Sequence, residues 1–281
     1  MSRAPQPLST DKAKEKRRQV VKEVEKQIPE VVKLRPEAPA DGYLCLPDNY
    51  PPLRPQLARV KVIDGDAYEA AIELTKEAIK AGDNKPVCVL NNANAGIPGG
   101  GYRHGSLAQE EDLCYRSTLI ATLKKELYPV KDHQAIYSPT VVIFRTRGNK
   151  DYNCEYPLMD FSKPQDFPVV SVVSVAAIYH PQVDNKANPP TWAKQSDRDL
   201  MYEKMRITLR ICVHNGHRSI VLGALGAGAY GNPNQAVAIA FREVLQEPEF
   251  RARFDNIVFA VMQDRRKCYD VFHKELDGVQ V

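Results

Sequence analysis

The feature that most restricts the fold of this sequence is an alternation of short β-branched runs with amphipathic helical patterns. Residues 60–63 predict a strand, Gly65-Asp66 a turn, residues 67–80 a helix, and the apolar run at 86–90 a second, buried strand. A strand, a helix and a strand in this order form a βαβ unit, in which the two strands are parallel. The sequence therefore predicts an α/β fold.

The rest of the chain continues with similar signals. We expect strands at 138–144, 169–177, 219–223 and 256–262, and helices at 198–214 and 269–276. The polar stretch 145–168 predicts a surface excursion. In the loop 180–197 stands the single tryptophan, Trp192, which we expect to serve packing, with base stacking as the alternative.

The N-terminal part differs in composition. Residues 1–9 are expected to be disordered, 11–27 predict a charged helix with a thin apolar stripe, and the proline-rich stretch 36–55 predicts an extended connector without packing of its own. We therefore predict an extension over 1–55 that packs on a core domain over 56–281.

Composition excludes several classes of protein. A chain of 281 residues can bury a substantial core, and its net charge of +4 is too mild to argue for direct nucleic-acid binding. No apolar run approaches the roughly 20 residues that span a bilayer, and the first residues lack the apolar core of a secretory signal. Six scattered cysteines without C-x-x-C spacing predict reduced thiols. We expect an intracellular protein, cytoplasmic or nuclear, without a membrane partner.

A glycine loop follows the predicted strand at 86–90. The backbone N–H groups of Gly99, Gly100 and Gly101 can approach a phosphate or a sugar closely, because these residues have no side chains. Ser106 and Gln109 have capping-box spacing, which predicts a helix from residue 107 and places 109–111 in its first turn.

Two opposing effects act on the ionisation of the acidic residues Glu110, Glu111 and Asp112 in this turn. A helix N-terminus favours the ionised carboxylate, whereas adjacent like charges and a bound diphosphate disfavour it, so that one of the three is expected to carry a proton near neutral pH when substrate is present. A protonated carboxyl group of this kind can act as a general acid. The alternative is that the acids merely stabilise the start of the helix.

A second glycine-rich loop occupies 223–233. It lies between a predicted strand and a helix for which Asn232 is the expected N-cap, an arrangement suited to binding an anion. Its G-x-G-x-x-G pattern also occurs in nicotinamide-binding folds, but only about fifty residues follow it, too few for such a domain. His214 and His217 flank a turn and are interpreted as surface residues, and we expect no metal and no cofactor.

The first loop resembles a known signature. Three glycines, seven residues and then Gln109-Glu110-Glu111 are similar to the signature of poly(ADP-ribose) glycohydrolases, and residues 112–119 resemble the microbial branch. Asn91 and Asn94 match the N-x-x-N of macrodomains, and 228–233 resembles their diphosphate loop. The ending of the strand at 176–180 departs from the Ala-Pro-Asn of the microbial family, which affects the shape of the pocket.

This resemblance implies a three-layer α/β/α macrodomain-like fold with a mixed, largely parallel central sheet. It implies hydrolysis of the ribose-ribose O-glycosidic bond of poly(ADP-ribose), with ADP-ribose as product and ADP-ribosylated proteins as partners. The process would be the reversal of ADP-ribosylation in the DNA damage response, carried out by a monomer. The alternatives are an ADP-ribose reader that does not cut, and a mono-ADP-ribosyl hydrolase.

The resemblance also assigns roles to residues. Glu111 would be the general acid and then the general base, Glu110 and Asn94 would hold ribose hydroxyls, and Gln109 would support the loop. Asp66 would face the adenine amino group, with a helix cap as the alternative reading. The backbones expected to hold the diphosphate and distal ribose are those of Gly99, Gly100, Gly101, Gly226, Ala227, Gly228, Ala229 and Tyr230.

Overall fold

The computed structural model describes residues 10–45, 57–148, 156–264 and 266–281. The disorder predicted for 1–9 and the domain boundary predicted at 55/56 fall outside these residues. No described helix combines the length and apolar character that crossing a membrane requires.

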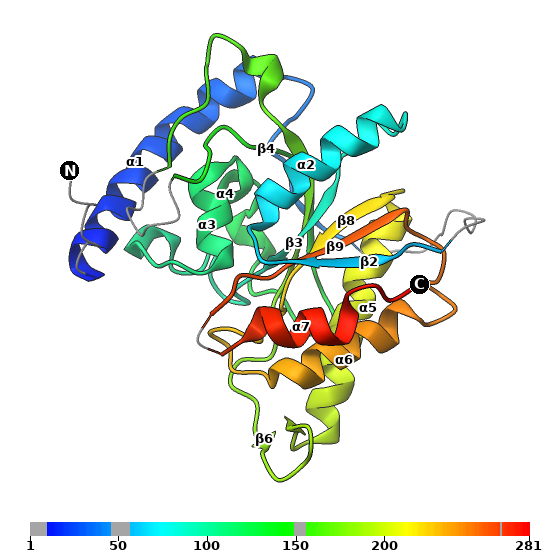
Figure 1. Ribbon diagram of the computed structural model, residues 1–281. Coiled ribbons are helices and arrows are strands. Elements are labelled where there is room, and N and C mark those ends of the chain that lie inside the picture. Colours follow the sequence, from blue (N-terminus) through cyan, green and yellow to red (C-terminus); the bar gives the residue numbers. More distant parts are fainter. Residues whose placement is uncertain (1–9, 46–56, 149–155, 265) are drawn as a thin grey trace, which may run out of the picture.

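A mixed sheet forms the middle layer (Figure 1). Among the described residues, this sheet has seven strands in the order β1-β4-β5-β3-β8-β9-β2. The last five pair in parallel, whereas β4 pairs antiparallel with both β5 and β1. The mixed, largely parallel sheet is thereby confirmed. The strands are β1 (Tyr43–Leu44), β2 (Val60–Ile63), β3 (Cys88–Asn92), β4 (Ile136–Val142), β5 (Val169–Val175), β8 (Ser219–Leu222) and β9 (Asn256–Ala260).

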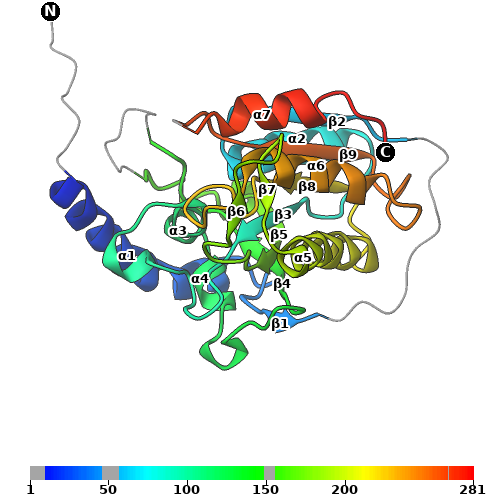
Figure 2. The same ribbon diagram turned by 90° about the horizontal axis from the view of Figure 1, so that it is seen from below.

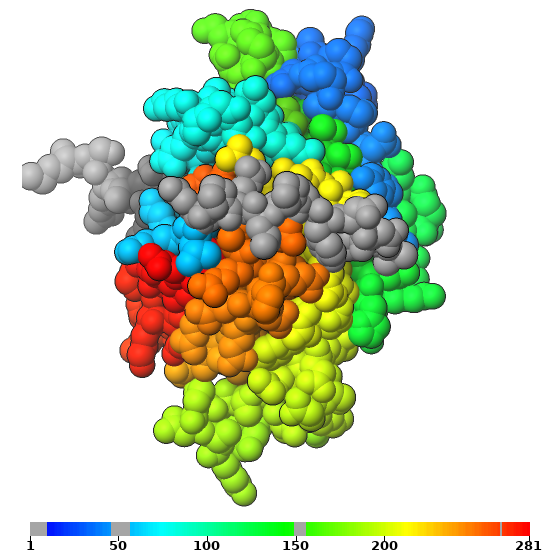
Figure 3. Space-filling view, turned by 90° about the vertical axis from the view of Figure 1, so that its right-hand side faces the viewer, coloured from blue at the N-terminus to red at the C-terminus, as the bar shows by residue number. Residues whose placement is uncertain are grey.

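Helices cover both faces of this sheet, as Figures 1 and 2 show. One face carries α1 (Thr10–Leu34), α2 (Ala67–Lys80), α3 (Gln109–Arg116) and α4 (Leu119–Thr122). The other carries α5 (Gln195–His214), α6 (Asn234–Leu245) and α7 (Cys268–Leu276). In Figure 3, α2 (cyan) lies above the α6 region (orange), and the hairpin of β6 (Val183–Asp184) and β7 (Thr191–Trp192) projects below.

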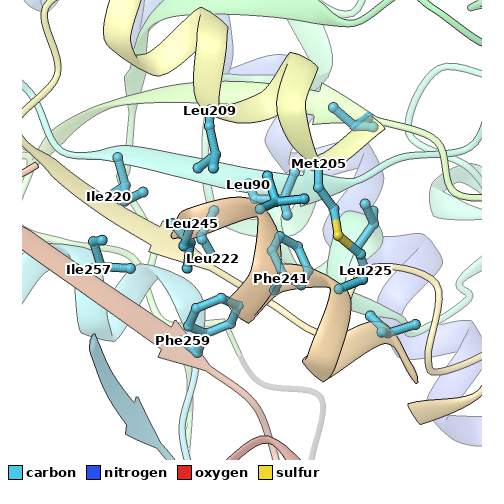
Figure 4. Packing of buried hydrophobic residues seen from close by; sticks show 14 of the residues in the cluster. Leu90, Met205, Leu209, Ile220, Leu222, Leu225, Phe241, Leu245, Ile257 and Phe259 are labelled. Atoms are coloured by element: carbon cyan, nitrogen blue, oxygen red, sulfur yellow. The ribbon is translucent and has the colours of Figure 1, made fainter. Parts of the chain in front are cut away.

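Alternation along the central strands explains the three layers. Val87 and Val89 contribute to the core beneath α2 and α3, whereas Cys88 and Leu90 contribute to the core beneath α5 and α6. Since successive side chains of a strand point to opposite faces, a strand covered on both sides reads as a continuous apolar run. Figure 4 shows Leu90 packed among residues of α5, α6 and the neighbouring strands.

Two of three expectations about loops need correction. The described part of the connector is not unpacked, because β1 pairs with β4 and Cys45 is buried. The stretch 145–168 is not wholly a surface excursion, since Arg145, Tyr156 and Phe167 are buried within its described residues. Trp192 is buried as expected, and its indole N–H donates to Asn232 at 2.9 Å, which confirms the packing role.

The prediction that His217 lies on the surface is wrong. Its side chain is buried, and its Nε2 and the hydroxyl of Tyr137 share a hydrogen bond of 2.7 Å. Burial lowers the pKa of His217 to about 4, so that it is a neutral core residue at physiological pH.

Candidate active site

A cavity of about 450 Å³ lies where the carboxyl ends of the parallel strands meet. Its wall is formed directly after β2, β3, β5, β8 and β9, which is where ligands bind in open α/β sheets. It includes six of the residues expected to bind substrate: Asp66, Gln109, Gly226, Gly228, Ala229 and Tyr230. Asn94, the first glycine loop, the two glutamates and Ala227 are not part of this lining, and their positions are described below.

Helix α3 begins two residues later than predicted. Ala108 is the N-cap residue, and its N–H donates to Oε2 of Glu111 at 2.7 Å. The third helical residue thus reaches back to the cap, which is the second half of a capping box. Ser106 does not cap; it lies against Gly101, where an added Cβ would stand 2.2 Å from the Ser106 hydroxyl oxygen.

The glycine loop and the two glutamates fit closely together. Oε1 of Glu111 accepts the N–H of Gly101 at 2.8 Å. Gly100 has a left-handed φ of 56°, and a Cβ there would be 2.8 Å from both Oε2 of Glu110 and Oε1 of Glu111. Glycine at this position therefore lets two carboxyl groups approach each other beside the backbone.

The N–H groups of this loop are not the free phosphate donors that the sequence suggested. Gly101 donates to Glu111, Gly100 donates to the carbonyl of Ile97 at 3.0 Å, and the Gly99 N–H is bonded to Glu110. The loop holds the glutamates, and this explains its fixed distance from them.

Glu110 is the acid of the turn that carries a proton. It is 3% exposed, and its Oε2 accepts the N–H of Asn94 at 2.8 Å. Burial raises the pKa of Glu110 to about 8, and the charge of Glu111 adds to this effect, while hydrogen bonds from Asn94, Asn91 and Gly99 oppose it. A protonated carboxyl group was expected here with substrate bound, and in the free protein Glu110 already has a raised pKa.

Gln109 joins the start of α3 to the end of β3. Its Oε1 accepts the N–H of Asn92 at 2.8 Å, and its Nε2 donates to the carbonyl of Leu90 at 2.7 Å. Asn94 forms the next turn, with its Oδ1 accepting the N–H groups of Gly96 and Ile97. Gln109 and Asn94 thus fix the segment between the strand and the glutamates.

Asn232 has a different role from the one predicted. Helix α6 begins at Asn234, with Pro233 as its N-cap residue, and the Asn232 amide donates to the carbonyls of Ile178 at 2.8 Å and Gly226 at 3.2 Å. These buried partners compete with capping, and together with Trp192 they tie the second loop to the end of β5. At Gly226, an added Cβ would meet Ala177 at 2.5 Å.

Beyond Gly226 the second loop opens toward the cavity. Ala227 is buried and its N–H donates to Ala224, but a Cβ at Gly228 would meet no atom within 4 Å. Among the described residues, no backbone carbonyl accepts the N–H groups of Gly228, Ala229 and Tyr230. These groups stand before the N-terminus of α6, where an anion is favoured.

Arg116 organises a buried charge cluster that sequence reasoning did not identify. It is fully buried and donates to Asp66 at 2.7 Å, Glu69 at 2.6 Å and Asp112 at 3.2 Å. The four-residue spacing of Asp112 and Arg116 on one helix was the available signal. The partner of Arg116 on the other side, Asp66, could not be inferred, because it lies 50 residues away.

Asp66 is a helix cap, as one of the two readings predicted. Its Oδ1 accepts the N–H groups of Tyr68 and Glu69, both at 3.0 Å, and Oδ2 lies 3.3 Å from Nη1 of Arg147. Burial opposes ionisation, yet Arg116, the Glu69 N–H and Arg147 hold the pKa of Asp66 below its usual value. By contrast, burial and the charge of Asp66 raise the pKa of Asp112 to about 6.

Among the described residues, no group of three or more His, Cys, Asp or Glu side chains could hold a metal ion.

Comparisons with known proteins point to one family of enzymes. Residues 9–146 match the family model of the microbial-type poly(ADP-ribose) glycohydrolase (PARG) catalytic domain. The chain is similar in structure to the PARG of Thermomonospora curvata, with a TM-score of 0.73 and 23% identity over 92% of this chain and 98% of that one. It is also similar to the PARG of Deinococcus radiodurans solved with ADP-ribose, with a TM-score of 0.63 and 25% identity over 89% and 91% of the two chains. The comparison with curated proteins gave no match.

Fold, carboxyl pair and family match together define an α/β/α glycosidase. Over residues 9–146, which contain the entire span from the three glycines to Glu111, the chain matches the microbial-type PARG family.

We expect Glu110→Gln to stabilise the fold above neutral pH. The folded-state pKa of about 8 lies above the unfolded value near 4.5, so the wild type loses stability as pH rises between them. Such a shift corresponds to a loss on the order of 4 kcal/mol at pH 8 and above. Glutamine does not titrate, so the variant should melt at a higher temperature at pH 8.5, with the difference closing toward pH 5. Thermal melts from pH 5 to 9 measure this, with Glu126→Gln on the surface as control. Parallel curves for Glu110→Gln and wild type would contradict the assignment of the proton.

Proposed function

We propose that the protein hydrolyses the ribose-ribose O-glycosidic bond of poly(ADP-ribose) with Glu111 as the general acid and then the general base. The observation that carries this proposal is the carboxyl pair beside Gly100, next to a cavity with an anion-binding loop. Both carboxyl oxygens lie on one side of the glycine backbone. They cannot straddle a sugar as the two carboxylates of most glycosidases do, and a single group must therefore serve both steps.

A proton close to Glu111 supports this scheme. Burial raises the pKa of Glu110 to about 8, so that Glu110 is protonated at neutral pH, and its Oε2 faces Gly100 together with Oε1 of Glu111. Glu111 delivers a proton to the departing ribose hydroxyl, and the resulting carboxylate then deprotonates the water that attacks the oxocarbenium-like ribose. The N–H groups of Gly101 and Ala108 keep the Glu111 side chain oriented throughout.

We assign the remaining substrate contacts from the cavity. The N–H groups of Gly228, Ala229 and Tyr230 receive the diphosphate, because they are directed toward no backbone carbonyl among the described residues and precede a helix. Oδ2 of Asp66 is the acceptor for the adenine amino group, since Oδ1 already accepts three donors. Glu110 and Asn94 hold ribose hydroxyls, and Gly99, Gly100, Gly101, Gln109, Gly226 and Ala227 support these groups through their backbone positions or side chain.

We also infer the wider setting. N-x-x-N at the end of β3 and the α/β/α layers support membership of the macrodomain superfamily. The five described cysteines are all buried thiols outside any disulfide, which supports a reducing, intracellular environment in which the protein reverses ADP-ribosylation of proteins after DNA damage. The contacts of α1 with α3 support an N-terminal extension that packs on the catalytic domain.

Release of ADP-ribose from an automodified, polymer-bearing protein tests the function. The wild type is expected to release ADP-ribose from polymer, and binding of free ADP-ribose is measured in parallel. A protein that binds ADP-ribose but releases none from polymer is a reader. A protein that acts only on a mono-modified substrate is a mono-ADP-ribosyl hydrolase. Either outcome overturns the proposal.

A further inference from the structure

An exposed aromatic group stands at the rim of the cavity. Tyr179 follows β5 and is 70% exposed, although its ring packs edge-on against two others. The ring centroids of Tyr179 and Tyr230 lie 5.1 Å apart at an interplanar angle of 89°, and those of Tyr179 and His180 lie 4.3 Å apart at 83°. T-shaped neighbours fix the orientation of a ring. Tyr179 therefore presents an oriented and largely exposed aromatic ring to solvent.

The backbone holds this arrangement in an unusual conformation. His180 has a φ of 47°, a left-handed value that costs free energy in a residue with a side chain. Its N–H donates to the carbonyl of Tyr230 at 2.9 Å, and a Cβ on Gly231 would stand 3.1 Å from its imidazole Nδ1. The end of β5 and the second loop thus fix each other, and Tyr179 is directed away from the core.

The aromatic group lies at the glutamate end of the cavity. Tyr230 lines the cavity and is hydrogen-bonded to the side chain of Asn94. Burial raises the pKa of Tyr230, and the charges of Glu110 and Glu111 contribute, which shows that the carboxyl pair is near. Tyr179 contacts Tyr230 and is the more exposed of the two rings. It is therefore the aromatic ring available to a group that leaves the scissile bond toward solvent at this end.

The chemistry of the polymer identifies that group. The hydroxyl that departs in the proposed reaction is the 2′-hydroxyl of the adenosine ribose in the neighbouring ADP-ribose unit. Adenine is attached to the adjacent carbon of the same ribose, so a purine base must lie within a few ångströms of the general acid. A flat aromatic face matches a purine, because stacking requires only two π-faces.

We propose that Tyr179, oriented by His180 and Tyr230, stacks on the adenine of the leaving ADP-ribose unit and so forms a binding subsite for polymer outside the cavity. The inference rests on the proposed function and deepens it. It predicts that the protein distinguishes a polymer bond from an ADP-ribose conjugate whose leaving group has no adenine.

Two substrates and three variants test the subsite. One substrate is poly(ADP-ribose), and the other is ADP-ribose joined at its distal ribose to a small phenol. For Tyr179→Ala we expect kcat/KM on polymer to fall roughly 5- to 100-fold, the range that loss of one stacked base corresponds to. The phenol conjugate should be cleaved as by the wild type, and inhibition by free ADP-ribose should be unchanged. Tyr179→Phe, which keeps the ring, should behave as wild type on both substrates.

A surface aromatic on another strand provides the matched control. Tyr43 is 44% exposed and also packs edge-on against a tyrosine, so Tyr43→Ala should leave both substrates unaffected. Unchanged polymer cleavage by Tyr179→Ala overturns the subsite, as does an equal loss on both substrates, which would mean that Tyr179 only positions Tyr230. A wild type that cleaves neither substrate refutes the proposed function itself, which these outcomes keep separate.

Discussion

Glu111→Gln is expected to lower kcat for ADP-ribose release from polymer by at least about 10³-fold, because in the proposed mechanism this side chain provides both proton transfers, and general acid-base catalysis contributes roughly 10²- to 10⁴-fold. Glutamine is nearly isosteric and can still accept the N–H of Gly101 or Ala108 with its carbonyl oxygen. Affinity for ADP-ribose should therefore remain close to that of the wild type. Loss of turnover with retained binding separates a chemical role from a structural one.

Two measurements make the Glu111 result decisive. Isothermal titration with ADP-ribose and a thermal melt show whether the variant is folded and still binds. Glu126→Gln makes the same chemical change at an exposed position and should release ADP-ribose at the wild-type rate. If Glu111→Gln kept turnover within tenfold of the wild type, a different group would be the acid, and Glu110 with its raised pKa would be the next to test.

The second large effect is expected at Arg116. Replacement by methionine leaves Asp66 and Asp112 buried, with Arg147 as the one cation paired with them among the described residues, at 3.3 Å and 3.9 Å from the two carboxyl groups. Removing one partner of a buried ion pair typically costs about 3 to 5 kcal/mol. We therefore expect the melting temperature of Arg116→Met to fall by roughly 10 °C in a protein of this size.

The cause of that loss can be separated from packing. If uncompensated charge is responsible, the double variant Arg116→Met/Asp112→Asn should recover part of the stability, since neighbouring sites are not additive. Arg18→Met removes an exposed pair with Glu15 and should change stability by less than about 1 kcal/mol. No recovery in the double variant would indicate that α2 and α3 are held together by the volume of the guanidinium and not by its charge.

The parts of the fold that follow from local pattern were predicted well. Strand β2 and helix α2 have the predicted bounds, because an apolar run and an amphipathic helix with an Asp66 cap are determined within a few residues. The order of the strands could not be inferred in this way. Antiparallel β1 at the edge of the sheet depends on pairing with β4, some ninety residues further along, and a two-residue strand has no pattern of its own.

In the site, the glutamates were identified from spacing, but the raised pKa of Glu110 was not. That pKa depends on burial and on the N–H groups that Glu110 accepts, and these depend on how the glycine loop folds back. The loop itself was misread for a similar reason. Glycines permit close approach, but the sequence does not say whether the approaching group is a ligand or the protein's own carboxylate.

The N-terminal helix α1 supports the loop that is hydrogen-bonded to Glu111. Arg17 is buried and donates from Nε to the carbonyl of Gly105 at 2.6 Å, and a Cβ on Gly105 would stand 2.4 Å from the Lys14 carbonyl oxygen. Helix α1 therefore contacts Gly105 at one end of the segment 101–105, and Gly101 at the other end is hydrogen-bonded to Glu111. In sequence, the proline-rich connector separates α1 from the sheet. A shortened protein that starts after the connector would keep both glutamates and lose these contacts of α1, so we propose that the extension predicted from composition takes part in positioning Glu111.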